Sequence, residues 1–462
     1  MNIEETENNS SETVQVIFKT NLPPKYQVPE TPIDLPLNLS RFGLSEIITH
    51  LLGLEETKIF EFLLQNEFLR SSLGEMLLKL ELTGEKIIEL EYTNSLSAPE
   101  PLGQYNHDDW VSSVHCIKRK MRNTKNSKEA NFFVTGCYDS FVRIWDIADQ
   151  ATPKIVIKGH SNAVKSVKWA KKDCNEYVLS GGMDQRIILW KIDHNLKMYS
   201  LVKEFHGHVS SIESISVSPN EKYFSSSSYD GSVLIWDLDS VIAKEKEREK
   251  EKEKEKEIEI SKEDNEKKTK RKRVLNKFET ESTIVPPRGQ LKGHKQRVTC
   301  LKWKEQEFIY TSSTDHCLRK FDIEKGLAVW EQRTPNSILS FELGENSNKN
   351  YIISAHTDSA IRVWDERVSP KEQENNGLSR LSSIKAHKNW VTSISWRPKS
   401  QYHFASCGYD HTVKIWDFRS QTPSTMITKN KHTDKVLMID WNDPNTLLSA
   451  SADKKVKINK II

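Results

Sequence analysis

The stretch "SSSYDGSVLIWD" (226–237) places a serine four residues before Asp230 and a tryptophan six residues after it. A recurring pattern of this kind has to be sought before the fold class is argued, because a fixed period defines a repeat architecture. The same spacing recurs in six further stretches: "TGCYDSFVRIWD" (135–146), "SGGMDQRIILWK" (180–191), "TSSTDHCLRKFD" (311–322), "SAHTDSAIRVWD" (354–365), "SCGYDHTVKIWD" (406–417) and "SASADKKVKINK" (449–460). These repeats dominate the chain.

Three residue types keep their places in the repeat. The aspartates, each four residues after a serine or threonine, are Asp139, Asp184, Asp230, Asp315, Asp358, Asp410 and Asp453. The residues six positions after them are Trp145, Trp190, Trp236, Phe321, Trp364, Trp416 and Asn459. A histidine, which follows glycine in three cases, precedes most copies: His107, His160, His208, His294, His387 and His432.

An alternating apolar run follows the histidine, as in "VKSVKW" (164–169), "VTCLKW" (298–303), "VTSISW" (391–396) and "VLMIDW" (436–441). Alternation with a period of two predicts a half-buried strand. Each repeat is therefore expected to form three or four short strands.

These motifs resemble the WD repeat, and the resemblance implies a mainly β fold with a seven-bladed β-propeller. In that family the repeated His, Ser/Thr, Asp and Trp side chains form a hydrogen-bonded network inside each blade. A buried aspartate is costly unless its oxygens are satisfied, so such a network is physically reasonable. Four sets are complete in sequence: His107/Thr135/Asp139/Trp145, His160/Ser180/Asp184/Trp190, His208/Ser226/Asp230/Trp236 and His387/Ser406/Asp410/Trp416.

The other repeats depart from this pattern. The fourth has Phe321, which packs but cannot donate a hydrogen bond, the fifth lacks the upstream histidine, and the seventh has Asn459. We expect those blades to be locally weaker. A catalytic interpretation of the His–Ser–Asp sets is rejected, because a hydrolase needs one triad and not several near-copies.

Closure of the ring is expected to involve both ends of the repeat region. The last repeat supplies only three strands before Ile462, and an open propeller would expose a strand edge. The segment before the first repeat, residues 98–106, is the expected fourth strand. The propeller is thus predicted over residues 98–462.

Composition narrows the class of protein. The chain has 462 residues, 36% hydrophobic and 29% charged, with a net charge of +3, so any basic surface for a partner has to be local. The six cysteines form no C-x-x-C pair, which argues against a zinc ribbon or redox motif and fits a reducing compartment. Neither a G-x-x-x-x-G-K-[ST] loop nor a G-x-S-x-G motif is present, so no enzyme and no cofactor of its own are expected.

A charged insertion separates the third and fourth repeats. Its Lys/Glu alternation puts opposite charges at i,i+3 and like charges at i,i+4, which nearly cancel on a helix. With few apolar residues, residues 240–288 are predicted to be disordered or only transiently helical. A basic cluster near its end is a candidate nuclear-localisation signal, or a site of contact with RNA phosphate, against the alternative of a solvated charge run: Lys267, Lys268, Lys270, Arg271, Lys272 and Arg273.

The first hundred residues have a different pattern. Residues 1–12 are polar and acidic and are predicted to be disordered. Strand-like runs at 14–20, 59–70 and 86–92 surround an apolar-periodic helix over 40–54, which suggests the order β, β, α, β, β, β. That order resembles a ubiquitin-like β-grasp domain, assigned to residues 13–95. It is expected to be a fused interaction module.

The combination of modules, with "RFGLSEIITHLLG" (41–53), "FLRSSL" (68–73) and "HDDWVSSV" (107–114), closely resembles the ribosome-biogenesis WD-repeat proteins that work with Pescadillo and the block-of-proliferation protein. The resemblance implies a nucleolar and nucleoplasmic assembly factor for the large (60S) ribosomal subunit. The propeller would bind the block-of-proliferation protein, and the ubiquitin-like domain would bind midasin, an AAA ATPase that strips factors from precursor particles.

The same resemblance implies a role for one carboxylate, Glu85, in "LTGEKIIELEY" (82–92). In this family a Glu of the ubiquitin-like domain completes, in trans, the coordination of a Mg²⁺ held by midasin. Mg²⁺ prefers oxygen ligands in near-octahedral geometry, so a carboxylate can fill a position left to water. Glu81 is the nearest competitor, whereas Glu89 and Glu91 fall at strand spacing and are expected at the surface.

Two alternatives remain open. One is a Notchless-like factor with the same modules, against which the repeat count and the basic insertion argue. The other is a WD-repeat substrate receptor of a ubiquitin ligase, which would co-purify with cullin subunits in place of ribosomal precursors.

Overall fold

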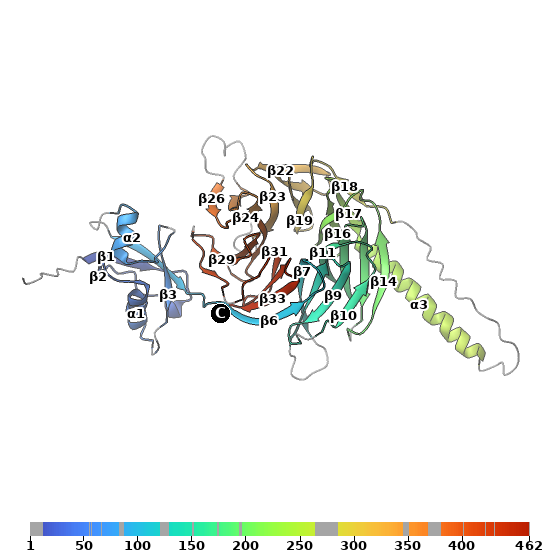
Figure 1. Ribbon diagram of the computed structural model, residues 1–462, viewed down its shortest axis with the longest axis horizontal. Helices are drawn as coiled ribbons and strands as arrows, with labels where there is room; N and C mark the ends of the chain where they lie inside the picture. The colour runs from blue at the N-terminus through green and yellow to red at the C-terminus, as the bar shows by residue number, and fades with distance from the viewer. Residues whose placement is uncertain are drawn as a thin grey trace, which may run out of the picture. The chain divides into compact units, whose positions relative to one another are not determined.

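The computed structural model describes residues 13–54, 56, 58–65, 67–82, 87–120, 129–149, 152–172, 175–193, 196–263, 285–344, 351–367, 380–400, 402–420, 422–428 and 430–461. The chain forms two compact units (Figure 1). The boundary between the N-terminal unit and the unit that contains the repeats falls between Ala98 and Pro99.

The N-terminal unit is a five-stranded sheet in the order β2-β1-β5-β3-β4 with two helices. Strands β1 and β5 pair in parallel, and the other pairings are antiparallel. Parallel first and last strands at the centre, with a helix after the first hairpin, are the arrangement of a β-grasp domain. The elements are β1 (Thr13–Lys19), a 3₁₀ turn (Pro24–Tyr26), β2 (Ile33–Pro36), α1 (Arg41–Leu51), β3 (Phe60–Leu64), β4 (Glu67–Phe68), α2 (Leu73–Lys79) and β5 (Ile88–Asn94).

Alternation along β1 explains how this unit builds its core. Val14, Val16 and Phe18 are buried while the intervening side chains are more exposed. They share one hydrophobic cluster with Leu44 and Ile48 of α1. Side chains at i and i+4 lie on one helix face, so the apolar period of residues 40–54 was sufficient to predict this helix.

The sequence interpretation missed α2 (Leu73–Lys79). Ser72 caps its first turn by accepting a hydrogen bond from the Glu75 backbone N–H (3.4 Å). Leu73, Met76 and Leu77 are buried on one face. A seven-residue helix is too short to show a full amphipathic period, and tertiary packing stabilises it more than propensity does.

The repeats form seven four-stranded antiparallel sheets, in agreement with the predicted mainly β propeller (Figure 1). The inner strands of successive blades pack side by side.

The strands are, for blade one, β7 (Val111–Lys120), β8 (Glu129–Cys137), β9 (Phe141–Asp146) and β10 (Ile155–Lys158); for blade two, β11 (Val164–Lys172), β12 (Asn175–Gly182), β13 (Ile187–Ile192) and β14 (Tyr199–Phe205); for blade three, β15 (Ile212–Val217), β16 (Tyr223–Ser228), β17 (Val233–Asp237) and β18 (Gly289–Leu291). For blade four they are β19 (Val298–Lys304), β20 (Phe308–Ser313), β21 (Cys317–Asp322) and β22 (Leu327–Arg333); for blade five, β23 (Ile338–Leu343), β24 (Tyr351–His356), β25 (Ala360–Asp365) and β26 (Arg380–Lys385); for blade six, β27 (Val391–Trp396), β28 (His403–Gly408), β29 (Val413–Asp417) and β30 (Thr425–Met426); for blade seven, β31 (Val436–Asp443), β32 (Thr446–Ser451) and β33 (Lys455–Lys460).

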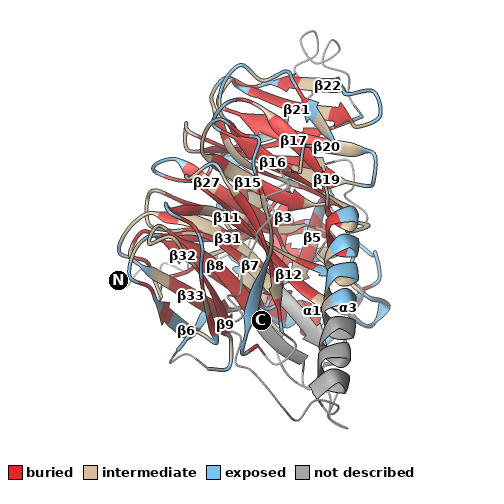
Figure 2. Ribbon diagram, turned by 90° about the vertical axis from the view of Figure 1, so that its right-hand side faces the viewer, coloured by how far each residue is buried: buried red, intermediate tan, exposed pale blue. Residues whose placement is uncertain are grey.

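Blade seven takes its fourth strand from before the first repeat, as predicted. β6 (Glu100–Asn106) pairs antiparallel with β33, with Tyr105 opposite Val456. Tyr105 is fully buried, and its hydroxyl donates to the Ile147 carbonyl in blade one (2.9 Å). The strand that closes the ring therefore also packs against the neighbouring blade. Figure 2 shows buried residues along inner strands such as β11 and β15.

The first part of the charged insertion, which was predicted to be disordered or only transiently helical, is helical in the structure. A helix, α3 (Leu238–Glu263), follows β17 directly. Leu238, Val241 and Ile242 are buried in one hydrophobic cluster with side chains of blades two and three. This anchored first turn supplies the costly nucleus, and the Lys and Glu residues that follow favour helix. Among the described residues, no helix is both long and apolar enough to cross a membrane.

Candidate interaction sites

The network inside a blade is best seen in blade two. The Trp190 indole N–H donates to the Ser180 hydroxyl (2.9 Å), which lies 2.8 Å from Nε2 of His160. Nδ1 of the same imidazole lies 2.9 Å from the Asp184 carboxylate. Because a carboxylate only accepts, we assign the imidazole proton to Nδ1 and let Nε2 accept from the serine.

The same chain of contacts recurs around the ring. His208 joins Ser226 (2.7 Å) and Asp230 (3.3 Å), and the Trp236 indole N–H donates to Ser226 (2.9 Å). In blade six His387 joins Ser406 (2.7 Å) and Asp410 (2.9 Å), and Trp416 is buried beside them. In blade seven His432 joins Ser449 (2.7 Å) and Asp453 (2.8 Å), while Asn459 bonds to Asn430 (3.2 Å).

Blade one is not the complete set that its sequence suggests. His107 contacts Thr135 (2.9 Å), and the Trp145 indole N–H donates to the same hydroxyl (3.2 Å). Asp139, however, forms an ion pair with Arg143 (2.7 Å), four residues later, and no hydrogen bond joins it to His107. Burial, and then the charge of Arg143, lowers the pKa of His107 to about 4. The Arg143 guanidinium therefore takes the place of the His107 imidazole as the partner of the Asp139 carboxylate.

Blade five does contain a network histidine, contrary to the expectation. His356 of β24 lies two residues after Ser354 and contacts its hydroxyl through Nε2 (2.7 Å). The Trp364 indole N–H donates to the same hydroxyl (2.7 Å). Asp358 binds the Arg362 guanidinium (3.1 Å) and the Asn336 amide (2.8 Å) instead. Because His356 lies on the strand and not in the loop before the blade, its position in the repeat concealed its role.

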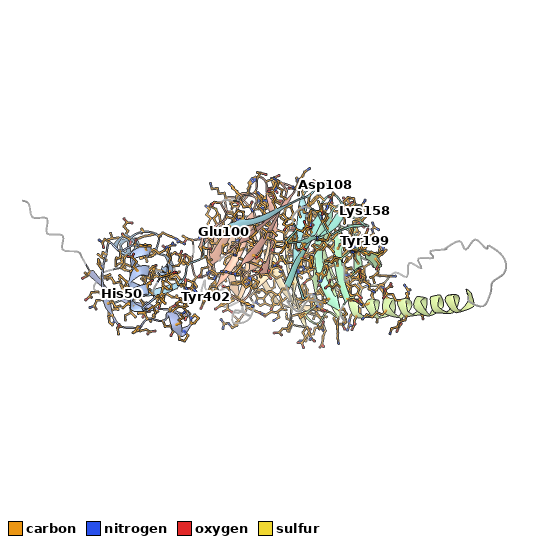
Figure 3. All side chains as sticks on the ribbon, turned by 90° about the horizontal axis from the view of Figure 1, so that it is seen from below. His50, Glu100, Asp108, Lys158, Tyr199 and Tyr402 are labelled. Carbon is orange, nitrogen blue, oxygen red and sulfur yellow. The ribbon has the colours of Figure 1, made fainter. Side chains whose placement is uncertain are left out.

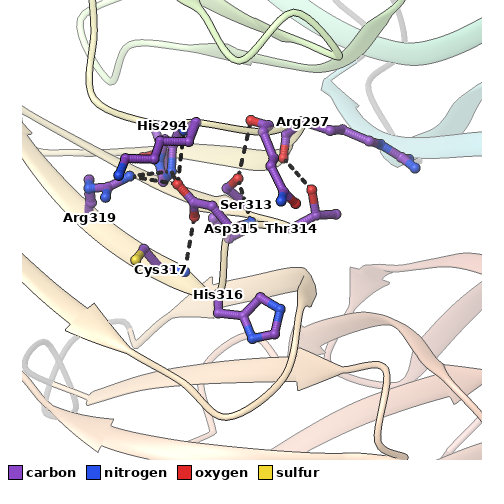
Figure 4. A network of polar contacts seen from close by, with 12 residues as sticks. His294, Arg297, Ser313, Thr314, Asp315, His316, Cys317 and Arg319 are labelled. Carbon is purple, nitrogen blue, oxygen red and sulfur yellow. Dashed lines mark hydrogen bonds and ion pairs between the residues drawn. The ribbon is translucent and has the colours of Figure 1, made fainter.

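Blade four combines both arrangements (Figure 4). His294 joins Thr311 (2.7 Å) and Asp315 (2.9 Å), and the Arg319 guanidinium binds the same carboxylate (3.0 Å). Phe321 is fully buried with its ring centroid 6.2 Å from that of His294. The phenylalanine fills the place of the tryptophan but leaves the threonine without an indole donor.

The aspartates of these networks are held ionised. Burial alone would raise the pKa of Asp184, Asp230, Asp315 and Asp410, but the histidine and nearby N–H groups outweigh it and hold each pKa well below its usual range. The pKa of Asp358 falls to about 2, because hydrogen bonds from Arg362 and Asn336 outweigh the same burial. Each carboxylate is used to fix a turn, and each network histidine is buried. This arrangement stabilises the blade and offers no nucleophile to a substrate.

Two predicted sites fall outside the described part of the chain. These are Glu85 and the basic cluster Lys267, Lys268, Lys270, Arg271, Lys272 and Arg273. Of the neighbouring carboxylates, Glu81 has a positive φ (52°) just after α2, and Glu89 is an exposed strand residue paired with Lys19 (2.6 Å). Among the described residues, no group of three His, Cys, Asp or Glu side chains is placed to hold a metal ion.

A closed seven-bladed propeller with buried blade networks, preceded by a β-grasp domain, defines a class of scaffolding proteins. The match to family models divides the chain in the same way: residues 14–77 match the NLE (NUC135) domain, and six segments match the WD domain, G-beta repeat: 99–146, 151–191, 199–237, 286–322, 378–417 and 424–458. The strands β24 and β25 of blade five lie between matched segments, in the blade whose histidine is displaced.

The curated relatives give the particular family. "Ribosome biogenesis protein WDR12 homolog" of Nematostella vectensis is 32% identical over 452 residues, covering 96% of this chain and 98% of the relative. The protein of the same name from Oryza sativa subsp. japonica is 30% identical over 465 residues, covering 97% and 96%. The chain belongs to this WDR12 family of ribosome biogenesis proteins. Its repeats and its family both indicate a scaffold.

Proposed function

We propose that this protein is a non-enzymatic assembly factor for the large (60S) ribosomal subunit, needed for maturation of its large rRNAs. The observation that carries the proposal is the similarity to ribosome biogenesis proteins along nearly the whole chain, with both modules included. In this proposal the propeller scaffolds the complex of Pescadillo and the block-of-proliferation protein. The N-terminal unit engages the midasin AAA ATPase for release from precursor particles.

The propeller is suited to scaffolding because its polar groups are used internally. The network histidine side chains are buried, and the network aspartates are bonded to groups within the blades, which leaves the loops and outer strands to contact partners. Binding residues are often carried on loops that a rigid scaffold positions. The proposed role for the propeller is therefore recognition of the block-of-proliferation protein without chemistry.

Glu85 is the residue proposed to meet midasin. The chain before it leaves α2, where the Leu82 backbone N–H donates to the Leu77 carbonyl (3.0 Å), and the chain after it enters the central strand β5. Both attachments lie in the core of one domain, since Leu77 and Ile88 are buried. In this proposal the Glu85 carboxylate, from the short segment between these two elements, is the ligand offered in trans to a Mg²⁺ that midasin holds.

The test is binding of the full-length protein to the Mg²⁺-containing adhesion domain of midasin. Glu85→Ala and Glu85→Asp are both expected to abolish the Mg²⁺-dependent interaction, because the shorter aspartate cannot reach the same coordination position. Glu89→Ala, a matched control on the exposed face of β5, should bind as the wild type does. Retained binding by Glu85→Ala would remove this residue from the proposed site.

We also propose that the protein accumulates in the nucleolus and nucleoplasm through the basic cluster at residues 267–273. Seven basic residues and no acid between Lys267 and Lys277 match the chemistry that import receptors read. Neutralising Lys267, Lys268, Lys270, Arg271, Lys272 and Arg273 should shift a fluorescent fusion to the cytoplasm. An unchanged nuclear signal would refute this part of the proposal.

A further inference from the structure

The loops that carry the network residues also carry aromatic side chains that the networks do not use. Trp110 and Trp390 lie three residues after His107 and His387, and they remain 41% and 44% exposed. Tyr138 and Tyr409 occupy the positions directly before the turn aspartates of the same blades. Equivalent positions in a propeller repeat lie on the same face of the ring. Blades one and six therefore present the same aromatic pair on one face, and blade seven lies between them.

The two pairs are built in the same way. The backbone N–H of each tyrosine donates to the carbonyl of its tryptophan, Tyr138 to Trp110 and Tyr409 to Trp390, both at 2.9 Å. The ring centroids lie 5.5 Å apart in blade one and 5.3 Å apart in blade six. Distances in this range are those of interacting aromatic rings, so each pair holds its tryptophan in a fixed place.

A lysine from the next blade lies over each tyrosine. Nζ of Lys165 is 5.2 Å from the Tyr138 centroid and 2.8 Å from its hydroxyl, and Nζ of Lys435 is 4.9 Å from the Tyr409 centroid. Both distances are within the range of a cation–π contact. We call Trp110/Tyr138/Lys165 and Trp390/Tyr409/Lys435 the aromatic–lysine clusters.

The lysines of these clusters differ from a similar cation elsewhere on the face. In blade three the exposed Tyr229 has Arg297 at 5.8 Å from its centroid, but that guanidinium is paired with Glu213 (2.7 Å). Among the ion pairs of the described residues, neither Lys165 nor Lys435 has a carboxylate partner. The aromatic–lysine clusters therefore each offer an exposed apolar ring beside a cation whose counter-charge is missing.

We propose that the face of blades six, seven and one is a docking surface for a protein partner that presents two apolar side chains, each beside a carboxylate. Blade seven lies between the two clusters and has alanine, Ala452, at the tyrosine position. The inference rests on the proposed scaffolding function and assigns it to one sector of the ring. Tryptophan and tyrosine are the side chains that most often dominate the binding energy of protein interfaces.

The same residues could stack on RNA bases, but the charges around them favour protein. Asp108 (Figure 3) and Asp109 precede Trp110, and Asp434 precedes Lys435. Asp108 is paired with Arg143 (2.7 Å), whereas the carboxylates of Asp109 and Asp434 each accept a hydrogen bond from the backbone N–H of the next residue. Carboxylates at these positions would repel a phosphate backbone, while a protein surface can place its own charges around them.

The test measures affinity of the full-length chain for the block-of-proliferation protein. Trp110→Ser and Trp390→Ser are each expected to weaken binding at least tenfold, and Lys165→Glu with Lys435→Glu to weaken it further by reversing the charge. Tyr229→Ser is the matched control: it removes an aromatic ring that is more exposed than either tryptophan and whose cation is already paired, and it should change affinity less than twofold. Circular dichroism checks that each variant is folded.

The outcomes separate the inference from the function on which it rests. If the wild type binds and the tryptophan and lysine variants bind equally well, the docking surface is overturned but the proposed function is not. These variants are Trp110→Ser, Trp390→Ser and the two lysine reversals. Failure of the wild type to bind overturns the proposed function and the inference with it. The docking surface is also overturned if the tryptophan variants lose affinity for single-stranded rRNA while protein binding stays intact. The face would then be an RNA-binding surface.

Discussion

At the scale of single residues, the resemblance of the repeated Ser, Asp and Trp spacing to the WD repeat predicted which side chains meet. The structure joins His160 to Ser180 and Asp184 as the repeat suggested. The structure departs from this prediction in blades one and five, where Arg143 and Arg362, four residues after the aspartate, bind the carboxylate in place of a histidine. Spacing cannot reveal that competition, because its outcome depends on which partner reaches a buried carboxylate with the better geometry.

His107 gives the clearest pH dependence. Its pKa is lowered to about 4 in the folded state, against about 6.5 in an unfolded chain. The unfolded state therefore binds more protons between these values, so stability is fully present above pH 6.5 and falls as the pH drops toward 4. At about 1.4 kcal/mol per pKa unit, this histidine contributes roughly 3 kcal/mol to that loss.

Urea denaturation at pH 7, 5.5 and 4.5 measures the effect. His107→Asn should lose less unfolding free energy than the wild type does over this interval, because the titrating group is gone. His206→Asn, at a half-exposed histidine, should follow the wild-type dependence. Identical pH dependence in all three proteins would show that His107 is not buried in its neutral form.

At the scale of elements, periodicity predicted the strands and α1 but not α2 or α3. α2 is too short to show its period, and the helical character of α3 depends on three apolar residues at its start, Leu238, Val241 and Ile242. The charge pattern beyond them is nearly neutral for helix formation, so the anchor decides. The fourth strand of blade seven was predictable because a missing partner leaves a strand edge.

The blades should differ in local stability. Blades two and three have the full Trp–Ser–His–Asp chain, whereas blade four has Phe321 and blade seven has Asn459 at the tryptophan position. A missing hydrogen bond to a buried hydroxyl costs about 1 kcal/mol, or roughly fivefold in local opening. Hydrogen exchange should therefore show faster exchange in β20 and β32 than in β12 and β16. Equal protection in all four strands would contradict this ranking.

Removing the anchor of α3 should unfold it. Ile242→Asp places a charge in the cluster shared with blades two and three, and the loss of a buried isoleucine alone costs roughly 2–5 kcal/mol. An isolated Lys/Glu helix has no stabilising free energy of this size to offset that loss. The circular dichroism signal at 222 nm should fall, while exposed Glu247→Gln should leave it unchanged. A helix signal that survives Ile242→Asp would mean that α3 does not depend on this contact.

At the scale of the whole molecule, the functional inference depended mainly on the order of the modules, a β-grasp domain followed by a propeller. The repeat count predicted a seven-bladed ring, and the strand order β2-β1-β5-β3-β4 agrees with the ubiquitin-like interpretation. The aromatic–lysine clusters could not be predicted, because Tyr138 and Lys165 belong to different blades and meet only when neighbouring blades pack. Glu85 was proposed from family resemblance and stays a prediction.

Ring closure by β6 makes a quantitative prediction. Deleting residues 1–98 should leave a propeller that unfolds cooperatively, because the boundary falls before β6. Deleting residues 1–106 removes the partner of β33 and the buried Tyr105 ring, which should lower the melting temperature by about 10 °C or more. Equal melting temperatures for the two deletions would show that β6 is not required for closure.

The most direct measurement is affinity purification with quantitative mass spectrometry of the wild type and of Glu85→Ala, expressed at equal levels in nucleated cells. The account predicts that both forms recover the block-of-proliferation protein, Pescadillo and large-subunit precursors, and that Glu85→Ala alone loses midasin and accumulates on the precursors. Recovery of cullin subunits without ribosomal precursors by the wild type would contradict the account.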